Sequence, residues 1–116
     1  MKTHFSASHL VEGYEGDCKK LHGHNWKIQV RVKTDIQNEI GISFDFKTLK
    51  GIVEPLIQKL DHEFLNDLDL LEGKNPTAEN LSEFIYYKIK EQLPEEAEMD
   101  KITVWETDKY SITYEE

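Results

Sequence analysis

Polar and apolar side chains alternate from residue 22 to residue 33, and this pattern constrains the fold more than any other feature of the chain. One parity holds His22, His24, Trp26, Ile28, Val30 and Val32. Such alternation is typical of a β-strand with one buried face, because successive side chains of a strand point to opposite sides. We therefore predict a strand over residues 22–34, with both imidazoles at its beginning and on its apolar side.

Residues 2–10 are predicted to form a preceding strand, on which Phe5, Ala7 and His9 share a face. The glycines and lysines of residues 11–20 favour a connecting loop. If the two strands pair antiparallel, His9 lies near the histidines of the second strand, close to that loop. The pattern thus predicts that three imidazoles converge.

The rest of the chain shows helical spacing first and strand-like alternation afterwards. A helix is predicted from the N-cap Asp45 to about Leu60, with a kink or break near Pro55. The other predicted elements are a polar loop at 66–76, a helix from Pro76 or Thr77 to about Leu93, and strands at 101–107 and 110–114. This order predicts one α+β domain over residues 1–116, with a four-stranded antiparallel sheet in β-β-α-α-β-β order and both helices on one face.

The charge balance excludes some classes of partner. A net charge of −9 and a pI near 5.0 argue against a nucleic-acid-binding protein, which needs a basic surface. The sequence has no apolar signal segment and no stretch long enough to cross a membrane, and its single cysteine suits a reducing compartment. We therefore expect a cytoplasmic protein without nucleic-acid or membrane partners. Basic residues near the histidine pair could still receive an anionic ligand: Lys19, Lys20, Lys27, Arg31 and Lys33.

Three converging imidazoles are typical of a catalytic zinc site with one open position. Two alternatives stay open: the H-G-H of residues 22–24 could be a chance occurrence, or Cys18 could supply a fourth ligand and close a structural site. Cys18 could instead be a nucleophile or proton carrier, since the lysines that follow it would favour the thiolate. It could equally be an inert loop residue.

Three further places could carry chemistry, and each also has a purely structural interpretation. Asp61 and His62 could be a carboxylate that orients an imidazole base, or a solvated pair at a helix end. Glu106 shares the parity of the apolar residues of strand 101–107, and a carboxylate on an apolar face needs a polar partner. Two adjacent N–H groups of a heterocycle could be that partner. The alternative is that the strand reaches solvent at residue 106. Thr77 and Asn75 could bind a ligand, although capping a helix is the simpler role.

These residues together resemble the 6-pyruvoyl-tetrahydropterin synthase superfamily and, within it, the 6-carboxy-tetrahydropterin synthase branch of queuosine biosynthesis. Five motifs in the same order carry the resemblance over nearly the whole chain: FSASH (5–9), CKKLHGH (18–24), LDHEFLND (60–67), NPTAEN (75–80) and WET (105–107). The short gap between Cys18 and His22 is similar to that of the carboxy-forming branch. Ser8 departs from the alanine that is more usual before the first ligand.

The resemblance implies the tunnelling fold, assembled as a trimer or a dimer of trimers (a homohexamer) with active sites between subunits. The implied roles are zinc binding by His9, His22 and His24, proton transfer by Cys18, Asp61 and His62, and pterin binding by Glu106 with Thr77 nearby. The implied reaction is that of a carbon–carbon lyase, which converts 7,8-dihydroneopterin triphosphate to 6-carboxy-5,6,7,8-tetrahydropterin, acetaldehyde and triphosphate without a redox cofactor. The alternatives are 6-pyruvoyl-tetrahydropterin synthesis, which stops before carbon–carbon cleavage, and a non-catalytic zinc- or pterin-binding protein.

Overall fold

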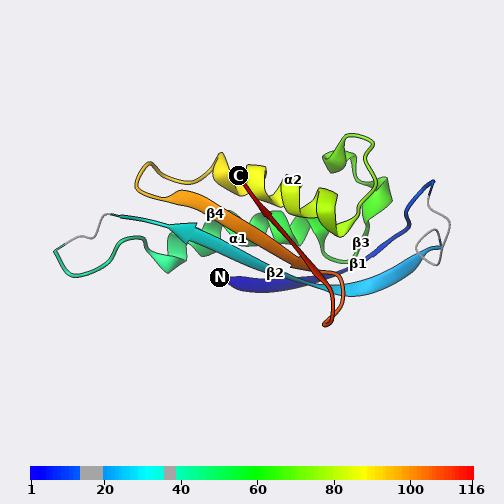
Figure 1. Cartoon of the computed structure of the whole chain (residues 1–116), viewed down its shortest axis with the longest axis horizontal. Helices are drawn as coiled ribbons and strands as arrows, with labels where there is room; N and C mark the ends of the chain where they lie inside the picture. The colour runs from blue at the N-terminus through cyan, green and yellow to red at the C-terminus, as the bar shows by residue number, and fades with distance from the viewer. Residues whose placement is uncertain (14–19, 36–38) are drawn as a thin grey trace.

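The computed structural model describes residues 1–13, 20–35 and 39–116, so Cys18 and Lys19 lie outside the described residues. The strands are β1 (Lys2–His9), β2 (His22–Lys33), β3 (Glu63–Phe64), β4 (Glu98–Trp105) and β5 (Ser111–Glu115). The helices are α1 (Phe46–Leu60), α2 (Ala78–Lys90) and the short 3₁₀ turns η2 (Leu65–Asp67) and η3 (Asp69–Leu71). The molecule is elongated, 55 × 24 × 22 Å, and the long strand β2 runs along its length (Figure 1). No helix in the described part of the chain is both long and apolar enough to span a bilayer.

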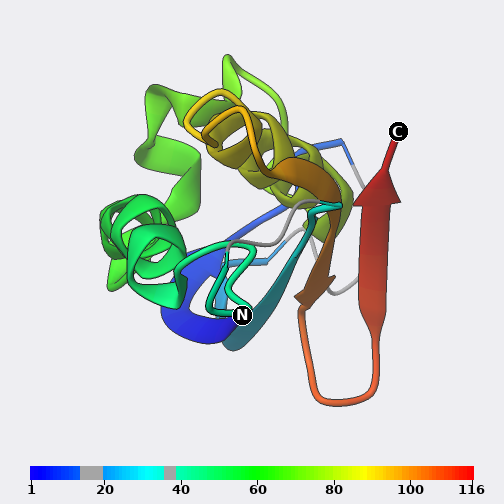
Figure 2. The same ribbon diagram turned by 90° about the vertical axis from the view of Figure 1, so that its left-hand side faces the viewer.

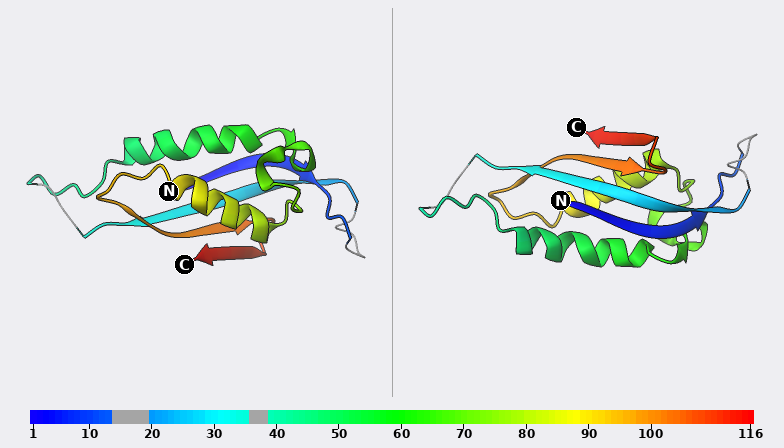
Figure 3. Two further views of the ribbon diagram at one scale, coloured as in Figure 1. Left: turned by 90° about the horizontal axis from the view of Figure 1, so that it is seen from above. Right: turned by 90° about the horizontal axis from the view of Figure 1, so that it is seen from below.

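The strands lie in the order β3-β1-β2-β4-β5, and both helices cover one face of the sheet (Figures 2 and 3). The predicted α+β class with both helices on one face is therefore confirmed. The prediction of four antiparallel strands is wrong in one respect, because β3 adds a fifth strand that pairs parallel with β1. A strand of two residues is too short to show an alternating pattern, so it can be recognised only from its contact with β1.

The predicted pairing of the first two strands is confirmed. β1 and β2 are antiparallel, with His9 opposite His22 and Ala7 opposite His24. Trp26 and Ile28, on the parity of the two β2 histidines, are at most 1% exposed, as expected for the face that the helices cover. The register thus brings three histidines to one end of the two central strands.

Helix α1 begins as predicted, because the side chain of Asp45 accepts a hydrogen bond from the N–H of Lys47 at 2.8 Å. The predicted break near Pro55 does not occur, since the helix is continuous from Phe46 to Leu60. A proline leaves the carbonyl four residues earlier, here that of Gly51, without its helical partner. Both Pro55 and Gly51 are exposed, so water can bond to that carbonyl, while the apolar stripe of the helix holds it against the sheet.

Two boundaries differ from the prediction by about three residues. Helix α2 ends at Lys90 rather than near Leu93, and β4 begins at Glu98 rather than at residue 101. The early start of β4 follows from the length of β2, because Glu98 and Met99 pair with the last residues of that strand. Strand β5 begins at Ser111, one residue later than predicted.

Candidate metal centre and catalytic groups

His9 is the most deeply buried member of the histidine cluster, with 1% of its surface exposed. Its Nδ1 lies 2.7 Å from the carbonyl oxygen of Pro76, which can only accept a hydrogen bond. Burial lowers the pKa of His9, so the ring is neutral at physiological pH, with its proton on Nδ1. Its Nε2 therefore carries a lone pair, as metal binding requires.

His22 is oriented in the same way. Its Nδ1 donates to the carbonyl oxygen of Lys20 at 2.6 Å, and its Nε2 lies 2.9 Å from the Nε2 of His9. Both Nδ1 atoms face carbonyl oxygens and so hold protons, which leaves the two Nε2 atoms to share either one additional proton or a metal ion.

His24 completes the cluster together with Glu106. Its Nε2 lies 2.9 Å from Oε1 of Glu106, yet the direction of this contact does not satisfy a hydrogen bond, and the nitrogen is buried without a hydrogen-bond partner. Burial lowers the pKa of His24, although the Glu106 carboxylate opposes the shift. A buried nitrogen with no hydrogen-bond partner is costly unless another ligand takes its lone pair.

The four groups fit a metal ion. One ligand atom from each of His9, His22, His24 and Glu106 lies within 4.8 Å of all the others. Three neutral imidazoles and one carboxylate are ligands that zinc accepts. Trp26 packs edge-on against His9 and His24, with ring centroids 4.9 and 5.4 Å away, and limits the movement of both rings. The alternative in which Cys18 closes the site concerns a residue outside the described chain.

Asp61 and His62 form a pair at the edge of the sheet, just after α1. Oδ2 of Asp61 lies 3.0 Å from Nδ1 of His62, and its Oδ1 accepts the N–H of Ser6 at 2.9 Å. The Ser6 hydrogen bond is the main reason why the pKa of Asp61 is lowered. The His62 side chain is 83% exposed, so its Nε2 is accessible from outside.

The structure does not bring this pair into the histidine cluster. His62 borders a hollow of about 470 Å³ together with Ser6, Ser8 and Asn25, which belong to the strand parity that faces away from the helices. His24 also borders this hollow, but neither Asp61 nor His62 belongs to the group of four candidate metal ligands in the described chain. The two predicted sets of site residues are therefore separate within one chain.

Thr77 has the structural role that was expected of it. Its Oγ1 accepts the N–H of Asn80 at 3.1 Å and caps helix α2. The residue before it has the more direct contact with the site, because the Pro76 carbonyl sets the tautomer of His9. Reasoning from the sequence missed this contact, since any residue type supplies a carbonyl.

Two asparagines hold the backbone that follows β1: Asn66, which reasoning from the sequence missed, and Asn75, which was expected to cap a helix or bind a ligand. The side-chain amide of Asn66 donates to the Leu10 carbonyl at 2.9 Å and accepts the Leu10 N–H at 3.0 Å. Asn75 makes the same two bonds to Glu12, at 2.9 and 3.0 Å. Each side-chain amide makes the donor and acceptor bonds that a residue of a paired strand would make. These bonds fix the path of the backbone after His9. Both asparagines lie in the motifs at 60–67 and 75–80, which are the only sequence signal for them.

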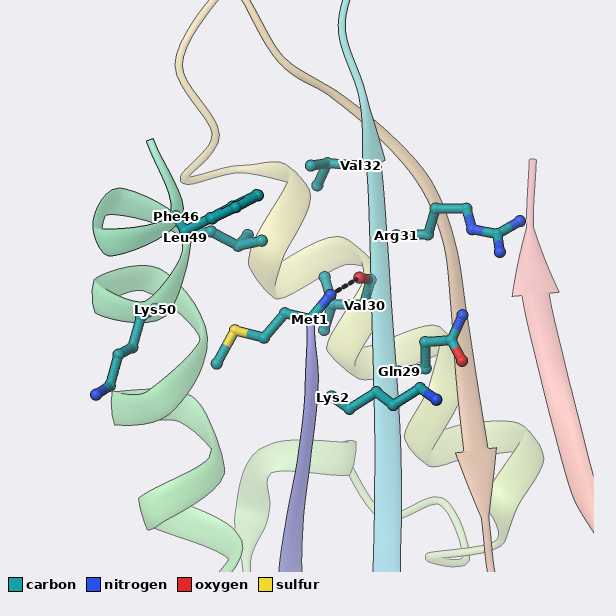
Figure 4. A pocket seen from close by; sticks show the side chains of 9 residues that line it. All are labelled: Met1, Lys2, Gln29, Val30, Arg31, Val32, Phe46, Leu49 and Lys50. Atoms are coloured by element: carbon teal, nitrogen blue, oxygen red, sulfur yellow. Dashed lines mark hydrogen bonds between the residues drawn. The ribbon is translucent and has the colours of Figure 1, made fainter. Parts of the chain in front are cut away.

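A cavity of about 560 Å³ lies at the other end of β2, between this strand and the beginning of α1 (Figure 4). Met1, Val32, Phe46 and Leu49 lie around it, and the N-terminal amine donates to the Val30 carbonyl at 2.8 Å (Figure 4). None of the predicted catalytic, metal-binding or pterin-binding residues lines this cavity, although Arg31, one of the basic residues considered for an anionic ligand, does. The chemistry is therefore assigned to the histidine end of the sheet.

Fold and site together define a class: a small α+β domain with a candidate metal centre at the end of its central strands. The chain belongs to the 6-pyruvoyl tetrahydropterin synthase family, whose family model matches residues 1–116. It is thus an enzyme of the tetrahydropterin synthase superfamily. The resemblance seen in the sequence motifs is confirmed.

Two relatives and one solved structure illustrate the similarity. The chain is 31% identical to 6-carboxy-5,6,7,8-tetrahydropterin synthase of Haemophilus influenzae, over 97% of this chain and 94% of the relative. It is also 31% identical to dihydroneopterin monophosphate aldolase of Pyrococcus furiosus, over 98% of this chain and 93% of the relative. The structure of Caenorhabditis elegans 6-pyruvoyl tetrahydropterin synthase superposes with a TM-score of 0.89 at 25% identity, over 100% of this chain and 92% of that one. This likeness confirms the tunnelling fold.

Proposed function

We propose that this protein is a zinc-dependent 6-carboxytetrahydropterin synthase. Its substrate is 7,8-dihydroneopterin triphosphate, which with one water gives 6-carboxy-5,6,7,8-tetrahydropterin, acetaldehyde and triphosphate, in the route to queuosine. The observation that carries the proposal is the cluster of three imidazoles, two of which are fixed by backbone carbonyls with Nε2 directed at one point. The similarity to a relative with this activity supports the choice of reaction.

His9, His22 and His24 would hold the zinc ion. When bound, zinc supplies Lewis-acid chemistry, which lowers the pKa of hydroxyl groups and stabilises developing negative charge on oxygen. Glu106 stands at the end of β4 with a 28% exposed side chain, where its carboxylate can bind the amino-pyrimidinone edge of the pterin. The family resemblance assigns Thr77 to the same pterin. Its oxygen accepts the N–H of Asn80, and its hydroxyl proton can still donate to a ligand.

The proton transfers fall to Asp61, His62 and Cys18. Because the Asp61 carboxylate lies against Nδ1 of His62, it favours the tautomer in which Nε2 is the base. Ser6 holds that carboxylate in place. Cys18, as its thiolate, accepts the second proton from a side-chain carbon and returns it as the thiol. The pterin ring gains the two hydrogens that the side chain loses, so the reaction needs no redox cofactor.

The separation between His62 and the histidine cluster supports a site shared between subunits of a trimer or a dimer of trimers. Mixing two inactive variants tests this. In mixed oligomers of His24→Ala and His62→Ala, random assortment restores about one quarter of the sites if the metal and His62 come from different chains. If both come from one chain, no activity returns. Light scattering of the wild-type protein measures the oligomeric state.

The central test is turnover of 7,8-dihydroneopterin triphosphate, with and without a chelator, followed by mass analysis of the products. We expect the carboxy product and acetaldehyde, and loss of turnover when the metal is removed. If only a 6-pyruvoyl product forms, the reaction stops before carbon–carbon cleavage and the proposal is wrong.

A second candidate activity is that of an aldolase on dihydroneopterin monophosphate. It is favoured by the similarity to the Pyrococcus relative, which extends over nearly the whole chain. Offering the monophosphate and the triphosphate in parallel separates the two candidates. The substrate with the higher kcat/KM identifies the activity.

A non-catalytic zinc protein is distinguished by Cys18→Ala. Our proposal expects this variant to keep its zinc while turnover falls by about 10²-fold or more, as for loss of a proton-transfer group. If zinc is lost together with the thiol, Cys18 is a metal ligand and the site is structural.

A further inference from the structure

Two different contacts require the carboxylate of Glu106. The proposed function assigns it to the edge of the pterin, whereas the structure places it among the histidines. We propose that Glu106 binds the metal while no pterin is bound and leaves it for the pterin, so that substrate recognition itself frees a metal position. This inference rests on the proposed function.

The geometry shows that Glu106 is a member of the metal cluster. Its Oε1 lies 2.9 Å from Nε2 of His24 and 3.8 Å from Nε2 of His9. The shorter contact is not a hydrogen bond, because Nε2 of His24 is buried without a hydrogen-bond partner. A carboxylate that lies close to imidazole nitrogens without hydrogen-bonding to them is placed as a fellow ligand of one cation.

The same carboxylate is free to leave. The backbone of Glu106 is fixed, since its N–H donates to the carbonyl of Tyr110 at 3.2 Å across the turn after β4. Within the described residues, the carboxylate has polar contacts only to His9 and His24. Its side chain is 28% exposed, so a ligand can reach it and side-chain rotation can redirect it.

The two contacts exclude each other. Two adjacent N–H groups of a pterin take both oxygens of one carboxylate in a bidentate pair. A carboxylate engaged in this way has turned away from the histidines. Binding of the pterin ring therefore opens a metal position for the oxygens of the substrate side chain, and until then Glu106 shields the metal from other anions.

The test uses cobalt-substituted protein and plain pterin, which has no side chain and so no hydroxyl to reach the metal. Binding is followed by quenching of pterin fluorescence, and the metal by the visible absorption of Co²⁺, which responds to a change of ligand. We expect plain pterin to change the cobalt spectrum of the wild type. We also expect plain pterin to make a chelator remove cobalt about tenfold faster. A tenfold effect is the lower end of the loss in metal affinity that follows removal of a group supporting the metal ligands.

Glu106→Gln keeps the shape of the side chain and removes its charge. Without pterin, its cobalt spectrum should differ from that of the wild type, and its cobalt should be released as fast as from the pterin-bound wild type. The matched control is Asp108→Asn, which changes an 82% exposed carboxylate in the same turn. It should behave as the wild type in every measurement.

The outcomes separate the exchange from the proposed function. If plain pterin binds to the wild type and the cobalt spectrum does not change, the exchange is wrong while pterin recognition stands. If Glu106→Gln has the wild-type spectrum without pterin, Glu106 is not a metal ligand and the exchange is again wrong. If plain pterin does not bind to the wild type at all, the exchange and the proposed function are both overturned.

Discussion

The histidine cluster and the Asp61–His62 pair are built in opposite ways. The cluster lies at the end of the layer between helices and sheet, where His9 is 1% exposed. The pair lies at the sheet edge, with a His62 side chain that is 83% exposed. Strand register assembles the first within one chain. The second leaves an oriented imidazole exposed, an arrangement consistent with the proposed site shared between subunits.

The backbone of His62 marks the same difference. Its φ of 60° lies in the left-handed region, which costs a non-glycine residue about 1 kcal/mol or more. The N–H of His62 donates to the carbonyl of Ser6 at 2.6 Å, which holds this conformation in place. The cluster contains no residue with a positive φ. The strained backbone is thus that of His62, the residue of the pair whose side chain is exposed.

Removal of a metal ligand should have the largest effect. His24→Ala is expected to lower metal affinity more than about 100-fold, and turnover by more than about 10³-fold because Lewis-acid stabilisation is lost. Metal content after dialysis measures the loss of affinity, and kcat/KM measures the loss of turnover. His4→Ala is the control, since this exposed histidine of β1 has the opposite parity to His9. Full metal content in His24→Ala would contradict the assignment.

Changes to the pair should separate turnover from metal binding. His62→Ala is expected to lower kcat by about 10²- to 10⁴-fold, the usual contribution of a general acid–base group. Metal content should equal that of the wild type, because His62 has no part in the cluster. Loss of metal in this variant would mean that the two regions are not independent.

His62→Gly should lower kcat as far as His62→Ala does and yet stabilise the fold by about 1 kcal/mol, because glycine adopts a positive φ without strain. Urea unfolding measures the change. His62→Ala is the matched control, since it removes the same imidazole but keeps the strain. Equal stability of the two variants would show that the backbone of residue 62 stores no strain.

The smallest effect concerns acid stability. The pKa of Asp61 is lower in the folded chain than its ordinary value of 3.8, chiefly because it accepts the Ser6 N–H. The unfolded chain therefore binds the proton more readily, so this carboxylate stabilises the fold above about pH 4 and loses that contribution as pH falls through its folded pKa. Asp61→Asn should unfold more easily than the wild type at pH 6, with a difference that shrinks towards pH 3. A constant difference across this range would contradict the role of the charge.

Much of the site was predictable because strands have a period of two. The alternation along residues 22–33 puts His22 and His24 on one face, and antiparallel pairing brings His9 to them. The apolar parity before Glu106 allowed two readings, a carboxylate on the helix-covered side or a strand that reaches solvent, and the structure places Glu106 just after β4 beside the histidines. Asp45 and Thr77 cap their helices as predicted, since capping depends on residues two or three positions away.

Only the tertiary structure decided how those side chains are held. The carbonyl that sets the tautomer of His9 is 67 residues away along the chain, and the N–H that binds Asp61 is 55 residues away. Backbone groups are the same in every residue, so no sequence pattern reveals which one will face a given side chain. The sequence by itself determined which residues share a face of the sheet. The packing of distant segments decided that Glu106 meets the histidines and that His62 does not.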